Sequence, residues 1–120
     1  MRIYHNPSCS KSCEALNLLK SHGADPTIIE YLNEPPTEQD LRALLALLHV
    51  GAHDIVRPGE PEYEAMGLTP NTPDDTIIAA IVRHPNLLQR PIVVTSDKAV
   101  IGRPPTKILD LFPATAEDVN

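Results

Sequence analysis

Two cysteines and a histidine lie close together near the start of the chain, in the segment "HNPSCSKSC" at residues 5–13. The chain holds no other cysteine, so any thiol chemistry depends on Cys9 and Cys13. His5 opens the segment, and a histidine beside a thiol can tune the thiolate or transfer protons. The segment is compatible with a reactive thiol, a metal site, a disulfide, or the inert start of a helix.

Cys9 follows a predicted strand and precedes a predicted helix, which places it at a helix N-terminus. Free backbone N–H groups and the positive end of the helix dipole favour an anion there. A thiol at this position has a lowered pKa, and the same N–H groups can hold the oxygens of an oxyanion. Ser12 follows at the spacing Cys-x-x-Ser, where thiol oxidoreductases often carry a second cysteine. The sequence therefore predicts Cys9 as a nucleophile, with a buried, inert thiol as the alternative.

Cys13 lies four residues after Cys9, and two interpretations stay open for it. It is either a passive, partly buried helix residue or a redox partner of Cys9. A disulfide between them requires Cα atoms within roughly 7 Å and matching side-chain directions. A structural zinc site needs a complete tetrahedral ligand set, and the chain offers no second pair of ligands to join His5 and the cysteines. We therefore expect no metal.

Arginine precedes proline at three places, Arg57-Pro58, Arg90-Pro91 and Arg103-Pro104. The guanidinium group is always charged and binds tetrahedral oxyanions through paired hydrogen bonds. Arginines gathered in a cleft of this acidic chain would form a local anion site. The alternative is that each is a solvated surface arginine beside a proline that ends an element.

The elements that must position these residues are predicted from hydrophobic spacing and turn residues. Strands are predicted at 2–5, 26–32, 91–95 and 99–102, and helices at 10–22, 34–48, 72–85 and 104–112. Thr37 is the expected N-cap of the second helix, with Asp40 at the capping-box position. Thr72 is the expected N-cap of the third helix, with Pro73 in its first position. Residues 61–68 are predicted as one or two helical turns.

The last two strands are predicted to form a hairpin, so part of the sheet is antiparallel. The element order predicts an α/β, thioredoxin-like fold with a mixed four-stranded sheet and a helical insertion before the C-terminal β-hairpin. In that fold a cis proline precedes a strand opposite the thiol, and Arg90-Pro91 is our candidate for it. A single domain is expected over residues 1–113, followed by a polar tail at 114–120.

Composition excludes several classes of function. The formal net charge is −6, so no global basic field attracts DNA or an anionic membrane. Aromatic residues make up only 3%, which disfavours nucleic-acid binding through stacking platforms. Without a membrane span or a secretory signal, a cytoplasmic location with reduced cysteines is expected. The acidic stretch 60–64 is expected to be a solvated face.

Five segments, taken together, resemble the ArsC family, the arsenate reductases that use glutathione and glutaredoxin: "IYHNPSCSKS", "YLNEPPT", "IVRPGEPEYEAMGL", "RPIVV" and "IGRPPTKILDLF". The resemblance spans residues 2–112 and implies that Cys9 attacks arsenate to form a thiol-arsenate ester. It places His5 and Ser12 around that thiol. It also implies that the oxyanion is bound by three arginines, Arg57, Arg90 and Arg103. Glutathione would be a co-substrate rather than a bound cofactor, and glutaredoxin would resolve the mixed disulfide and release arsenite.

The chain departs from the family at one position, because Cys13 stands where an arginine usually follows "CSKS". A second thiol therefore replaces a cation, which suggests that Cys13 takes over part of the external thiol cycle. Two other functions remain open. A glutaredoxin-like thiol oxidoreductase without arsenate activity would not need the three arginines. Spx-like redox-sensing transcriptional regulators share the fold, but they carry Cys-x-x-Cys where this chain has Ser12.

Overall fold

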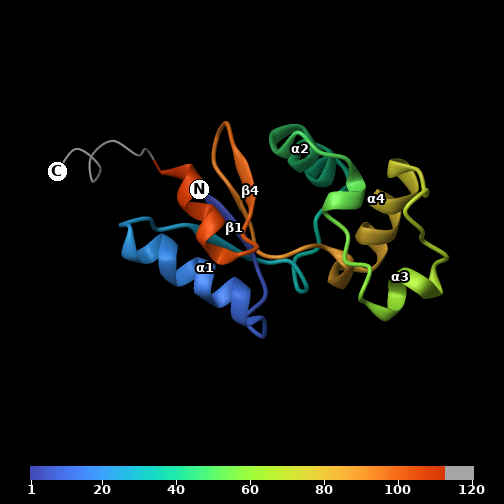
Figure 1. Cartoon of the computed structure of the whole chain (residues 1–120), viewed down its shortest axis with the longest axis horizontal. Coiled ribbons are helices and arrows are strands. Elements are labelled where there is room, and N and C mark those ends of the chain that lie inside the picture. The colour runs from blue at the N-terminus through green and yellow to red at the C-terminus, as the bar shows by residue number, and fades with distance from the viewer. Residues whose placement is uncertain (113–120) are drawn as a thin grey trace. The chain divides into compact units, whose positions relative to one another are not determined.

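The computed structural model describes residues 1–112, which form a mixed four-stranded sheet with helices (Figure 1). The strands lie in the order β2-β1-β3-β4, where β1 is Arg2–His5, β2 is Thr27–Glu30, β3 is Ile92–Val94 and β4 is Ala99–Ile101. β3 is antiparallel to β1, with Val93 opposite Ile3, and antiparallel to β4, with Val93 opposite Val100. The predicted hairpin and the mixed sheet are therefore confirmed.

The described chain divides into two compact units. The first contains residues 1–28 and 90–112, with α1 (Ser10–Ser21), β1, β3, β4 and the 3₁₀ helix η3 (Pro105–Leu111). The second contains Ile29–Gln89, with α2 (Glu38–Leu48), η1 (Ala52–Asp54), α3 (Pro61–Ala65), α4 (Asp74–Arg83) and η2 (Pro85–Leu87). The predicted helical insertion falls in the second unit. The single domain over 1–113 stays a prediction, and the tail at 114–120 lies outside the described residues.

The core of the first unit joins the two ends of the chain. Its fully buried residues come from β1, α1, β3 and η3: Ile3, Ala15, Leu19, Val93 and Ile108. Ala15 and Leu19 are one helical turn apart and so share one face of α1, and α1 packs against η3 and β1. Burying each large aliphatic side chain stabilises the fold by about 1.5–3 kcal/mol. This packing fixes the start of α1, and therefore Cys9, beside the sheet.

The second unit is built around α4, which packs against α2, η1 and η2. Its contact face is apolar, because Ile77, Ile78 and Ile81 are buried. Val56 and Leu88 form an antiparallel bridge between two extended segments of this unit. The Arg57 N–H donates to the Leu87 carbonyl at 2.7 Å, which fixes the backbone of Arg57.

The helix starts show how local chemistry set the boundaries. The Thr37 hydroxyl accepts from the Asp40 N–H at 3.1 Å and the Asp40 carboxylate accepts from the Thr37 N–H at 3.0 Å, so the predicted capping box is confirmed. The predicted N-cap of α4 is wrong by one residue, because Pro73 occupies that position in an extended conformation. The Thr72 hydroxyl instead accepts from the Thr69 N–H at 2.8 Å, within the preceding turn.

Two Arg-Pro peptide bonds of the described chain are cis, Arg90-Pro91 and Arg103-Pro104. The first confirms the prediction, and the second was not predicted. The last helix is 3₁₀ rather than α-helical, although it lies within the predicted range. Among residues 1–112, no helix is both long enough and apolar enough to cross a bilayer.

Candidate active site

Cys9 is the N-cap residue of α1, as the sequence predicts. Its backbone is extended, with φ −100° and ψ 121°. Its N–H donates to the Asn6 carbonyl at 3.0 Å, and its carbonyl accepts from the Cys13 N–H at 3.0 Å. The residue is half-buried. The thiol therefore stands at the positive end of the helix without being sealed from solvent.

The loop before Cys9 is shaped by Asn6, which is buried. The Asn6 side-chain oxygen accepts from the Ser8 N–H at 2.9 Å, and the Asn6 N–H donates to the Ser12 hydroxyl at 3.1 Å. Asn6 thus connects to the loop through its side chain and to the first turn of α1 through its backbone. Asn6-Pro7 is a turn signal in the sequence, and the Asn side chain commonly stabilises such a turn by accepting from a backbone N–H two residues on.

His5 and Ser12 form a buried pair directly behind this loop. Ser12 is fully buried, and its Oγ lies 2.6 Å from Nδ1 of His5. Ser12 Oγ also accepts from the Asn6 N–H, so one buried hydroxyl joins the histidine, the loop backbone and the first turn of α1. The structure therefore brings both predicted residues to the thiol loop. Their catalytic roles stay predictions.

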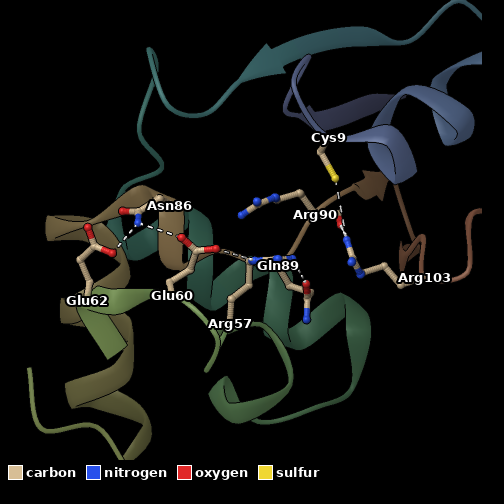
Figure 2. A network of polar contacts seen from close by, with 8 residues as sticks. All are labelled: Cys9, Arg57, Glu60, Glu62, Asn86, Gln89, Arg90 and Arg103. Atoms are coloured by element: carbon tan, nitrogen blue, oxygen red, sulfur yellow. Dashed lines mark hydrogen bonds and ion pairs between the residues drawn. The ribbon is translucent and has the colours of Figure 1, made fainter. Parts of the chain in front are cut away.

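Arg90 and Arg103 both act on Cys9 within the first unit, and Figure 2 shows the contact of Arg103 with the sulfur. Nη1 of Arg103 lies 4.0 Å from the Cys9 sulfur and donates to the Arg90 carbonyl at 2.8 Å. The pairing of β3 with β4 explains this, because both arginines flank the same end of the hairpin. The Gly102 N–H donates to the Pro91 carbonyl at 2.9 Å and so ties the two Arg-Pro segments together.

The pKa of Cys9 depends on two opposing effects. Partial burial is the largest single influence, and it raises the pKa because it disfavours the thiolate. Dipoles and charges act in the other direction, in the order Ser12 N–H, Arg90 guanidinium, Arg103 guanidinium and Lys11 N–H. Together they outweigh burial and hold the pKa of Cys9 below the ordinary value of a cysteine. The Ser12 and Lys11 amides lie in the first turn of α1 and act as backbone donors toward the thiolate.

Cys13 is half-buried and lies in the first turns of α1. Both cysteines are free thiols. The Cys13 thiol donates to the Pro7 carbonyl at 3.4 Å, so it is turned toward the loop that carries Cys9. Its role as a redox partner stays a prediction.

Arg57 belongs to the second unit, and its partners there are Glu60 and Gln89 (Figure 2). Its Nε lies 3.3 Å from a Glu60 oxygen, and its Nη1 donates to the Gln89 side chain at 2.9 Å. The Asn86 amide donates to Glu60 at 3.3 Å and to Glu62 at 2.7 Å. The expected solvated acidic face is therefore wrong at Glu60, whose side chain is only 23% exposed. The role of Arg57 in substrate binding stays a prediction.

Gln89 and Asn86 escaped the sequence analysis because their contacts depend on long-range pairing. Gln89 reaches Arg57 only because the bridge between Val56 and Leu88 sets two distant segments side by side. An isolated Asn in a short 3₁₀ helix, or an isolated Gln between that helix and a strand, carries no local signal for such a contact.

A thiol at the N-cap of the first helix, a cis proline before β3 and this sheet order define a thioredoxin-like protein with a single-cysteine Cys-x-x-Ser motif. The chain belongs to the ArsC family, whose model matches residues 4–111. The predicted fold and the predicted family are both confirmed.

Relatives of nearly full length support this assignment. The chain is 42% identical over 113 residues to the protein YfgD of Escherichia coli K12, and the matched region covers 92% of this chain and 95% of that protein. It is 38% identical over 112 residues to the arsenate reductase of the same organism, covering 92% and 79% of the two chains. The solved structure of an arsenate reductase from Vibrio cholerae matches with a TM-score of 0.88 at 39% identity, covering 92% and 96%.

Proposed function

We propose that the protein is an arsenate reductase in which Cys9 is the nucleophile. One observation carries the proposal: two guanidinium groups from the β3–β4 hairpin face a helix-capping thiol of lowered pKa, with Arg103 Nη1 4.0 Å from the sulfur. A disulfide exchanger has no need of two cations beside its thiol, whereas an enzyme that binds a tetrahedral oxyanion does. The names of the relatives agree with this choice.

In the first step the Cys9 thiolate attacks the arsenic atom of arsenate. A sulfur–arsenic bond forms, and one arsenate oxygen leaves as water after it takes up protons. The negative charge on the remaining oxygens is stabilised by Arg90, Arg103 and the N–H groups at the start of α1. His5 and Ser12 hold the loop and helix turn that carry these N–H groups.

In the second step we propose glutathione as the co-substrate. Its thiolate attacks the Cys9 sulfur, a sulfur–sulfur bond forms, and the electron pair of the sulfur–arsenic bond passes to arsenic. Arsenic(V) is thereby reduced to arsenic(III), and the two sulfurs become a mixed disulfide. Glutaredoxin then reduces that disulfide and regenerates Cys9. This cycle needs no bound cofactor, and it suits a cytoplasmic protein whose thiols are kept reduced.

The test is arsenate-dependent NADPH oxidation in the presence of glutathione, glutaredoxin and glutathione reductase. We expect Cys9→Ser to reduce the rate by roughly a thousandfold or more, because the nucleophile is lost. Ser10→Ala, at the exposed neighbouring position, is the matched control and should retain the rate. Unchanged activity in Cys9→Ser would show that the chemistry lies elsewhere. Turnover of a glutathione mixed disulfide, without any arsenate dependence, would instead support a glutaredoxin-like exchanger.

A further inference from the structure

A second thiol lies one helical turn from the nucleophile, and the cycle described above does not use it. The Cys13 N–H donates to the Cys9 carbonyl at 3.0 Å, so the two residues are in regular helical register. Four residues of helix rise by about 6 Å, which lies within the Cα separation of about 4.4–6.8 Å that disulfides allow. The Cys13 thiol leans toward the N-terminal end of α1, as its contact of 3.4 Å with the Pro7 carbonyl shows.

Both sulfurs are held only by long contacts, since the Cys9 sulfur lies 4.0 Å from Arg103 Nη1 and the Cys13 sulfur 3.4 Å from the Pro7 carbonyl. Cys9 is the N-cap residue, so its carbonyl accepts the first helical hydrogen bond while its own backbone is extended and its side chain makes no capping hydrogen bond. The first turn of α1 contains no acidic residue, so it lacks the stabilisation that a negative side chain gains from the positive end of the helix dipole. The Cys13 thiol is held only by a weak donor contact to a carbonyl. Rotation of the two side chains, with slight fraying of the first turn, would align them.

We propose, on the basis of the proposed arsenate reduction, that Cys13 acts as an internal resolving thiol. The Cys13 thiolate, having lost its proton to water, attacks the Cys9 sulfur of the thiol-arsenate ester. The Cys9–Cys13 disulfide forms, the sulfur–arsenic bond breaks, and its electron pair reduces arsenic(V) to arsenic(III). Arsenite leaves with protons taken from water. A dithiol, such as a glutaredoxin-type protein or dithiothreitol, then returns both cysteines to thiols.

The experiment is a single turnover without glutathione. Reduced full-length protein is mixed with arsenate, and arsenite, free thiols and the intact mass of the chain are measured after quenching. We expect one arsenite per chain, the loss of both thiols and the loss of two hydrogen masses in a monomer on a non-reducing gel. In Cys13→Ser and in Cys13→Ala the arsenite formed should fall at least about tenfold, because no second sulfur can form the disulfide. Glu14→Gln, at the exposed next residue of α1, is the control and should match the unmodified chain.

The outcomes separate this inference from the proposed function. Arsenite that appears only when glutathione is added would overturn the role of Cys13 and leave the arsenate reductase proposal standing. Equal arsenite from Cys13→Ser and the unmodified chain, or a disulfide between two chains, would also overturn the role of Cys13. No arsenite with or without glutathione and glutaredoxin would overturn both proposals.

Discussion

The reactivity of Cys9 depends on groups that come from opposite ends of the chain. The Ser12 and Lys11 amides come from α1, whereas Arg90 and Arg103 flank the C-terminal hairpin. Burial alone would raise the pKa of Cys9 and make the thiol inert. The sequence indicates the helix contribution, since Cys9 precedes a clear helix. It cannot show that the amides and the guanidinium groups together outweigh burial, because that result requires the fold.

The first prediction concerns the charge beside the sulfur. In a Cys13→Ser background, Arg103→Ala should move the inflection of the alkylation rate of Cys9 to higher pH. The pKa of Cys9 is lowered in the folded chain, so the thiolate is present above that pKa and is lost as the pH falls through it. Removing a cation at 4.0 Å weakens the preference for the thiolate. The pH profile of iodoacetamide alkylation measures this shift.

Lys107→Ala is the matched control for this prediction, because it removes an exposed positive charge from η3 of the same unit. An unchanged profile in Arg103→Ala, or an equal shift in Lys107→Ala, would show that Arg103 does not stabilise the thiolate.

The second prediction concerns the buried hydroxyl of Ser12. Ser12→Ala removes the partner of the Asn6 N–H at 3.1 Å and of His5 Nδ1 at 2.6 Å. Leaving buried polar groups without a partner costs about 1–3 kcal/mol, so the free energy of unfolding should fall by that amount. Urea denaturation measures it, with the exposed Ser10→Ala as control. Equal stability of the two variants would show that the Ser12 hydroxyl does not support the loop.

At the scale of elements, the contact between Gly102 and Pro91 holds the two arginine-bearing segments together. A Cβ at Gly102 would lie 2.9 Å from Pro91 Cγ and 3.2 Å from Ile108 Cγ2. Both neighbours are constrained, one by a ring and one by the core. The absence of a side chain at Gly102 therefore lets β4, η3 and the Pro91 segment approach closely.

The third prediction follows from this contact. Gly102→Ala should lower the free energy of unfolding by about 1–3 kcal/mol through overpacking, and it should slow alkylation of Cys9 because Arg90 and Arg103 are displaced. Thermal unfolding and alkylation kinetics measure the two effects. Gly59→Ala is the matched control, since nothing lies within 4 Å of a Cβ at that position. If Gly102→Ala were as stable and as reactive as Gly59→Ala, this close approach would not position the arginines.

The elements that the sequence predicted well are those whose signals are local. The capping box of Thr37 and Asp40 lies within one turn, and hydrophobic spacing located α1 and α2 to within a few residues. The N-cap of α4 was wrong because Thr72 has a competing local use, its hydrogen bond from Thr69. Local signals cannot decide such a competition between two neighbouring turns.

Contacts between distant segments were the features that the sequence could not supply. The pairing of Arg57 with Gln89 depends on the bridge between Val56 and Leu88, which are more than thirty positions apart. The resemblance to the ArsC family indicated which arginines to consider, but not which carboxylate or amide holds each of them. The close packing of Gly102 against Pro91 could not be predicted either, because it depends on how the strands pair and on the position of η3.

At the scale of the whole molecule, the chain divides its candidate residues between two units. The thiol, Arg90 and Arg103 lie in the first unit, which is assembled from both ends of the described chain. Arg57 lies in the second, within a continuous segment that has its own core of α2 and α4. All the groups that lower the pKa of Cys9 belong to the first unit.

The fourth prediction is that Arg57→Ala lowers kcat/KM for arsenate, chiefly through a higher KM. Hydrogen bonds to a charged group contribute about 1.5–3 kcal/mol, which corresponds to roughly a tenfold to hundredfold loss. The pH profile of Cys9 alkylation should stay unchanged, since none of the groups that lower the pKa of Cys9 is Arg57. Steady-state kinetics in the coupled assay and alkylation of the same preparation measure both quantities.

Arg42→Ala separates substrate binding from a general effect on the second unit. Arg42 is paired with Glu38 and Asp75, both at 2.8 Å, but these are exposed ion pairs, which contribute little to stability. Its loss removes the same charge from the same unit and should leave kcat/KM unchanged. Arg57→Ala also deprives Glu60 of a partner at 3.3 Å, so urea denaturation of each variant must accompany the kinetics. Lower stability with an unchanged KM would make Arg57 a structural residue of the second unit, because an arginine that binds the oxyanion must change KM when it is removed.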